Sequence, residues 1–194
     1  MVISISASPK ALVEPLIEPL TQQLFSKREF IPLGADVLWR IDRGVVRTST
    51  WNQEKQRIAL GYWGPGDIVG HPLSRIEPYI IECLTTVEMS ILPPLLLYRS
   101  LDALICHVQQ TEELLSIVHL HPISRRLWQF LVWLSQKFGR DVEQGRLIGF
   151  PVTHQELAEA ISTTRVSVTR MLQLFESEGM LQRLQRRLII CHGG

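Results

Sequence analysis

Residues 153–179 read THQELAEAISTTRVSVTRMLQLFESEG. Thr153, followed three residues later by Glu156, forms the capping-box pattern that begins a helix. Thr164 is a suitable N-cap for a second helix, and Gly179 is a suitable residue to end it. Two short helices separated by a turn of three or four residues predict a helix-turn-helix.

The two predicted helices carry apolar residues at three- and four-residue spacing, which is typical of one buried face. These inner positions are Leu157, Ala158, Ile161, Val168, Met171, Leu172 and Phe175. The opposite face of the second helix carries Arg165, Val166, Thr169 and Arg170. Arginine suits the O6 and N7 atoms of guanine, and the methyl groups of Val and Thr suit the thymine methyl group. We therefore predict that these four residues read base edges in the major groove.

Residues expected to contact the DNA backbone surround that face. Polar side chains suited to phosphate oxygens are Thr153, Thr164, Ser167 and Gln173. Residues 180–184 and 187–190 read as a β-hairpin whose tip is made basic by Arg183, Arg186 and Arg187. Such a wing can lie along the phosphate backbone. The alternative from the pattern alone is a structural three-helix module with a solvated arginine face.

Two further helices are predicted between residues 101 and 138, with a break at His121-Pro122. The first has an apolar stripe of Leu101, Leu104, Ile105, Val108, Leu115 and Val118. The spacing alone leaves two interpretations open, because this stripe could pack on the rest of the chain or form a seam between two subunits. Residues 140–149 are polar and contain glycine, so we expect a hinge there.

Short runs of branched and aromatic residues between residues 28 and 92 are separated by Gly, Pro, Asn and Asp. This pattern predicts many short strands, as in a barrel or jelly roll. The whole chain therefore reads as an α+β protein in three segments. These are a β-rich segment 1–100, connecting helices 101–139 and a DNA-binding segment 140–194.

The 194-residue chain carries 20 Lys and Arg against 19 Asp and Glu, so any DNA contact must come from a local basic face. Cys83, Cys106 and Cys191 lie far apart, which argues against a disulfide framework or a four-thiolate metal site. We expect a reduced, cytoplasmic protein with no membrane partner, because no signal peptide or membrane-spanning run is apparent.

Several of these segments resemble the CRP/FNR family of bacterial transcription regulators. The resemblance is carried by FPVTHQELA at 150–158, RVSVTR at 165–170 and EGML at 178–181. It is especially close to the cyanobacterial nitrogen-control branch, and it extends to turns at 44–47 and 64–70. It implies an N-terminal double-stranded β-helix of the cyclic-nucleotide-binding type, shortened here. It also implies a long dimerisation helix and a C-terminal winged helix-turn-helix.

The resemblance implies a homodimer joined through residues 101–119, which favours the subunit seam. Two recognition helices would then enter successive major grooves of a near-palindromic operator. Arg165 and Arg170 match base-reading positions of the family, whereas Val166 replaces an acidic residue that many members use. The half-site should therefore differ from theirs. Ser162 stands where most members have glycine in the turn. Activation is the commoner family role, with RNA polymerase as the implied partner.

The resemblance also bears on effector ligands. Members that bind cAMP or cGMP carry a Gly-Glu pair followed by Arg-Ser or Arg-Thr. Here His71 follows Gly70, and Arg75 is the only nearby cation, so a cyclic nucleotide is disfavoured. The 2-oxoglutarate-binding arginine of the nitrogen-control branch aligns near Pro78, which disfavours that dicarboxylate as well. No cofactor is predicted, and regulation without an effector or by a protein partner stays open.

Two rival functions differ in class. A dimeric regulator that acts only through protein partners would lack outward arginines on its second helix. A cupin-like metal enzyme would need a cluster of His and Glu on adjacent strands, and His71 alone does not supply one. We therefore predict a DNA-binding regulator with no catalytic residues and no metal site, and not an enzyme.

Overall fold

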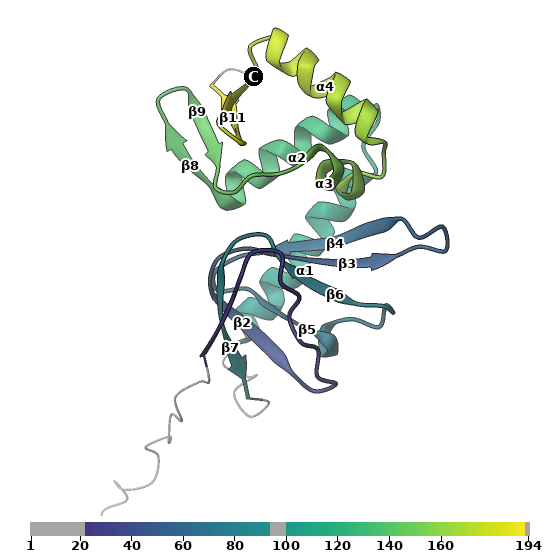
Figure 1. The fold of residues 1–194 in the computed structure, drawn as a ribbon, viewed down its shortest axis with the longest axis vertical. Coiled ribbons are helices and arrows are strands. Elements are labelled where there is room, and N and C mark those ends of the chain that lie inside the picture. The colour runs from purple at the N-terminus through teal and green to yellow at the C-terminus, as the bar shows by residue number, and fades with distance from the viewer. Residues whose placement is uncertain (1–21, 94–99, 193–194) are drawn as a thin grey trace, which may run out of the picture.

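A computed structural model describes residues 22–93 and 100–192. Its strands form a β-roll at one end, and the helix-turn-helix with a small sheet lies at the other end (Figure 1). The long helix α1 runs behind the roll and leads toward the second part (Figure 1). The expected order of roll, connecting helices and winged helix-turn-helix is confirmed. Within the described residues, no helix has both the length and the apolar content needed to cross a membrane.

The β-roll is made of two antiparallel sheets that share one core. The first has the order β1 (Gln22–Phe25), β7 (Val87–Leu92), β2 (Leu38–Arg43) and β5 (Ile68–Gly70). The second has the order β4 (Arg57–Trp63), β3 (Val46–Trp51) and β6 (Ile80–Cys83), and a short 3-10 helix, η1 (His71–Leu73), follows β5. Trp39 and Met89 of one sheet are buried against Trp63 and Ile81 of the other. The roll therefore has a filled apolar interior.

The connecting helices are α1 (Leu101–Val118) and α2 (Ile123–Phe138). Gly139 follows α2 directly, as the sequence predicts. The buried face of α2 contains Leu127, Phe130, Leu131 and Leu134. This face packs in the same core as the helix-turn-helix, so α2 supports the DNA-binding segment.

The winged segment contains α3 (His154–Ala160), α4 (Arg165–Ser177) and a four-stranded sheet. That sheet has the order β10 (Leu181–Leu184), β11 (Arg187–Cys191), β9 (Gly145–Ile148) and β8 (Gly139–Val142). The hinge expected at 140–149 is wrong, because these residues form the β8–β9 hairpin, and β9 pairs with β11. The polar residues that suggested a hinge lie on the outer strand β8, in the β8–β9 turn and at Arg146 of β9, whereas Leu147 and Ile148 are buried.

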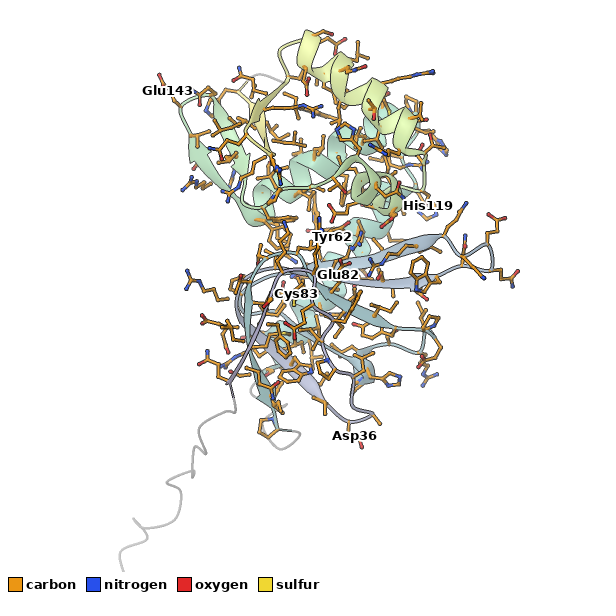
Figure 2. The ribbon with its side chains drawn as sticks, in the orientation of Figure 1. Asp36, Tyr62, Glu82, Cys83, His119 and Glu143 are labelled. Carbon is orange, nitrogen blue, oxygen red and sulfur yellow. The ribbon has the colours of Figure 1, made fainter. Side chains whose placement is uncertain are left out.

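The β-roll and the helix-turn-helix are packed directly on each other. Val45 and Tyr62 of the roll belong to the same buried cluster as Leu157 and Ile161 of the DNA-binding segment. Figure 2 shows Tyr62 at this junction, above Glu82. The roll therefore forms part of the surface on which the helix-turn-helix packs.

A buried ion network crosses the same junction. Arg47 on β3 is only 2% exposed, and its guanidinium lies 2.9 Å from a carboxylate oxygen of Glu82 on β6. The same guanidinium lies 2.8 Å from a carboxylate oxygen of Glu159 on α3. Removing one partner of such a buried pair is costly, because it leaves a charge without compensation. This network therefore favours one orientation of α3 on the roll.

Candidate nucleic-acid interface

The start of α3 has the reciprocal capping predicted from the sequence. The Glu156 backbone N–H donates to Thr153 Oγ1 at 3.1 Å, and the Thr153 N–H donates to a Glu156 carboxylate oxygen at 2.6 Å. This confirms the capping box. The Thr153 hydroxyl is exposed and keeps its hydrogen, so it can still donate to a phosphate oxygen.

The turn into α4 is also held by local hydrogen bonds. Ser162 has a φ of +53°, a left-handed conformation that favours glycine. Thr164 Oγ1 accepts from the Ser167 N–H at 3.1 Å, and the hydroxyl groups of Thr164 and Ser167 lie 2.9 Å apart. Thr164 is therefore the N-cap of α4, and both predicted phosphate-binding hydroxyls lie at the start of this helix.

The two faces of α4 differ as expected. Val168, Leu172 and Phe175 are buried in the core. The four predicted base-reading residues line one shallow hollow of about 370 Å³, namely Arg165, Val166, Thr169 and Arg170. Val166 is 61% exposed, a high value for a branched apolar side chain. The fold thus brings the four side chains together on a surface that the chain does not cover. Gln173, which is also predicted to contact the DNA backbone, is exposed further along α4.

The β10–β11 hairpin forms the predicted wing, but its arginines do not lie together. Arg186 and Arg187 are exposed at the turn, where Gln185 adopts a φ of +58°. Arg183 does not lie at the tip as expected. It lies within β10 and forms an ion pair with Glu176 near the end of α4. Arg183 thus links the wing to the recognition helix, which leaves Arg186 and Arg187 as the unpaired cations of the wing among these three.

His154 joins three elements of the interface, and the sequence analysis gave it no role. Its Nδ1 atom lies 2.8 Å from Thr169 Oγ1, and its Nε2 atom lies 3.4 Å from Nη1 of Arg183. Burial, with the neighbouring cations Arg183 and Arg165, lowers the pKa of His154 below its ordinary value. Because His154 and Thr169 lie on different helices, no spacing rule within one helix could have predicted this contact.

The apolar stripe of α1 is divided between two faces. Leu101, Ile105, Val108 and Leu115 are exposed, with values of 59%, 47%, 56% and 57%. Leu104 is half-buried and packs against the small roll cluster of Leu38, Ile68 and Leu92. Val118 is also half-buried and packs against the main core. The four exposed residues have the spacing of a two-helix seam. Leu104 and Val118 pack α1 against its own chain.

The other side chains considered as possible metal ligands do not form a cluster in the described residues. Within residues 22–93 and 100–192, no group of three His, Cys, Asp or Glu side chains could hold a metal ion. Cys83, Cys106 and Cys191 are free thiols. His107 on α1 stacks on Trp63 with ring centroids 4.0 Å apart. Of these residues, Cys83 belongs to the core of the roll, and His107 packs on the roll through Trp63.

Comparison with known proteins agrees with this arrangement. Residues 125–192 match the model of the Crp-like helix-turn-helix domain. The chain is 40% identical over 190 residues to "Regulatory protein CysR" of Synechococcus elongatus, covering 94% of this chain and 91% of that protein. It is 26% identical over 147 residues to "Global nitrogen regulator" of a Nostoc species, covering 76% of this chain and 61% of that protein.

A solved structure shares the fold. A CRP-family transcriptional regulator from Thermus thermophilus matches with a TM-score of 0.76 at 23% identity, covering 87% of this chain and 91% of that chain. The roll, the connecting helices and the DNA-binding segment are thus found together in a related architecture. With the outward arginines of α4 and the relative of similar length, these findings establish that the chain belongs to the CRP/FNR family of transcription regulators, near its nitrogen-control branch.

Proposed function

We propose that the protein binds a near-palindromic duplex operator as a homodimer and activates transcription through contact with RNA polymerase. The hollow on α4 carries this proposal, because two guanidinium groups and two methyl-bearing side chains face outward from a helix whose opposite face is buried. A helix supported in this way can enter a major groove. Activation is the commoner role in the family, and a DNA-bound regulator acts in the cytoplasm of a bacterium.

The exposed side chains of α1 support the homodimer. Four large apolar residues on one helix face form a patch that a monomer has no reason to expose. A two-fold axis along this face would bring the same residues of two copies together. The two α4 helices would then be related by that axis, and the operator would be near-palindromic.

Arg165 and Arg170 support a half-site that contains guanine. Each guanidinium can bind O6 and N7 of one guanine through two hydrogen bonds. Val166 offers no acceptor to a cytosine amino group, so this position should not select cytosine as an acidic residue does. The relatives include proteins named global nitrogen regulator, and the resemblance to that branch favours a related half-site.

We infer that DNA binding requires neither a cyclic nucleotide nor 2-oxoglutarate. Gly70 is followed by His71 where a cyclic-phosphate site would have an acidic residue, and Trp63 and Tyr79 fill the roll interior. The Arg47–Glu159 ion pair holds α3 on the roll through side chains of the chain itself. Contacts within the chain therefore orient the helix-turn-helix on the roll without a bound ligand.

Selection of bound sequences from random duplex DNA tests the proposal. The full chain should enrich one near-palindromic site, and the same site should be enriched when cAMP, cGMP or 2-oxoglutarate is added. The matched control replaces both Arg165 and Arg170 by alanine, and it should enrich nothing beyond general DNA binding.

Two outcomes would overturn parts of the proposal. Failure of a folded, dimeric parent to enrich any sequence would favour a regulator that acts through protein partners alone. Enrichment only in the presence of one metabolite would instead retain DNA binding and remove the effector-independent mode.

A further inference from the structure

The hydroxyl group of Thr169 is engaged inside the protein, although Thr169 lines the hollow proposed to face DNA. Thr169 Oγ1 donates to the backbone carbonyl oxygen of Arg165 at 2.9 Å. The same oxygen lies 2.8 Å from Nδ1 of His154. These contacts bear on how Thr169 reads a base, and the inference rests on the proposed DNA-binding function.

The hydrogen-bond pattern favours one tautomer of His154. A threonine hydroxyl has one hydrogen, and here that hydrogen is directed to the Arg165 carbonyl. His154 Nδ1 must therefore be the donor in its contact with Thr169. In a neutral imidazole the other nitrogen, Nε2, is then an acceptor, and it faces Nη1 of Arg183, which can only donate. The two contacts thus agree on a neutral ring with hydrogen on Nδ1.

We propose that His154 is a positioning residue that holds the Thr169 hydroxyl in these internal contacts, so that Thr169 reads a thymine through its methyl group. The hydroxyl has no hydrogen left to donate to guanine or to thymine O4. With the hydroxyl group engaged, the methyl group is the part of the side chain left to contact a base from the hollow. Val166, three residues earlier on α4, presents methyl groups beside it in the same hollow.

The contact also couples the wing to the recognition helix. Arg183 of β10 is paired with Glu176 near the end of α4, and its guanidinium faces His154 at the start of α3. A single row of side chains therefore runs from Glu176 through Arg183 and His154 to Thr169. His154 can relay the position of the wing to the Thr169 rotamer.

This arrangement requires an uncharged His154. The charged groups that face the ring are Arg183 of β10 together with Arg165 and Glu176 of α4. A proton on Nε2 would set two donors and two positive charges against each other at the Arg183 contact. Burial and the two arginines keep the pKa of His154 below its ordinary value, in agreement with this requirement. The unfolded chain binds this proton more readily, so the contact contributes less stability as the pH falls below about 6.5.

Thymine-to-uracil replacement in the operator tests the proposal directly, because uracil lacks only the C5 methyl group. Each thymine of the selected operator is replaced in turn, and the affinity of the full chain is measured at one salt concentration. The affinity of the parent should fall roughly three- to fivefold when the thymine that Thr169 contacts is replaced, as expected for one buried methyl group.

Two variants of Thr169 separate its methyl group from its hydroxyl group. Thr169→Val keeps the methyl group and should retain the loss on uracil replacement. Thr169→Ser keeps the hydroxyl and should bind the thymine and uracil operators equally. Val166→Ala is the matched control, since it should change discrimination at a different thymine. The reverse pattern, with Ser discriminating and Val not, would show that the hydroxyl reads the base and would overturn the proposal.

Variants of His154 test the positioning role. His154→Ala releases the Thr169 hydroxyl and should weaken thymine–uracil discrimination, whereas His154→Asn keeps a side-chain N–H near the Nδ1 position and should restore it. In the Thr169→Val background, His154→Ala should have no effect on discrimination, because no hydroxyl remains to be held. An equal effect of His154→Ala in both backgrounds would contradict a role through Thr169.

A long-range proton–nitrogen NMR spectrum of the folded protein gives an independent readout. The His154 ring should show hydrogen on Nδ1 at pH 7 and should titrate below pH 6.5. A ring with hydrogen on Nε2 would overturn the inferred hydrogen-bond pattern. If the parent binds no duplex at all, the proposed function fails, and this spectrum still reports on the contact itself.

Discussion

The outer faces of α1 and α4 are both left uncovered by the chain, yet they differ in chemistry. The α1 face consists of branched aliphatic side chains such as Ile105 and Val108. The α4 face combines the methyl groups of Val166 and Thr169 with the guanidinium groups of Arg165 and Arg170. Both helices bury their inner faces against the same chain, so the outer residues are not required for the fold.

The difference indicates two kinds of partner. An apolar surface with the spacing of a helix seam is best covered by an identical surface, since nothing in it selects a polar ligand. A surface with two arginines matches the acceptor-rich edge of guanine and the charged DNA backbone. The two faces should therefore respond to substitution in different measurements.

The largest effect is expected from Ile105→Arg on the α1 face. A charged residue in the apolar seam should separate the dimer into monomers in sedimentation velocity. Operator affinity should then fall by about 10²–10⁴-fold, because each half-site is bound without help from the second. Affinity for an isolated half-site should be unchanged.

The neighbouring residue provides the control for that prediction. Leu104 packs on the roll cluster of its own chain, so Leu104→Ala should lower the free energy of unfolding by on the order of 1–2 kcal/mol and leave the dimer intact. A dimer that survives Ile105→Arg would place the subunit interface elsewhere. It would also remove the proposed contrast between the two faces.

A smaller effect, about 1–3 kcal/mol in operator affinity, is expected from Arg170→Ala on the α4 face. The loss should be confined to operators with the preferred base at one position of each half-site. The dimer should remain intact, because Arg170 is exposed on a helix remote in sequence from α1. Competition binding with single-base operator variants checks this, and an unchanged base preference would contradict a base-reading role.

Much of this interface could be predicted because its signals are local. The Thr153–Glu156 capping box and the buried spacing of α4 depend on residues close in sequence, and both are confirmed. The outward position of Arg165 and Arg170 follows from the same helical period. Local rules were enough to place the recognition helix and its exposed face.

Sequence reasoning fell short where packing between distant elements decides. Leu104 and Ile105 have similar side chains in one apolar stripe, and only the presence of β5 beside α1 distinguishes them. The expected hinge at 140–149 is a hairpin because β11 supplies a neighbour from the end of the chain. The sequence suggested that Arg183 lies with the other wing arginines. Its ion pair with Glu176 could not be predicted, because Glu176 lies on a different element, α4.

The smallest effect is expected in the wing, where Arg187 has no ion pair in the described residues and Arg183 has one. Arg187 is exposed at the start of β11 without an ion pair in the described residues, so it can contact a phosphate. Arg187→Ala should weaken binding to all sequences alike and should reduce the salt dependence of binding by about one phosphate contact. Arg183→Ala is the matched control, because Arg183 already pairs with Glu176, and its loss should leave the salt slope unchanged. Equal changes of slope in both variants would show that the wing binds DNA through charge alone, without regard to internal pairing.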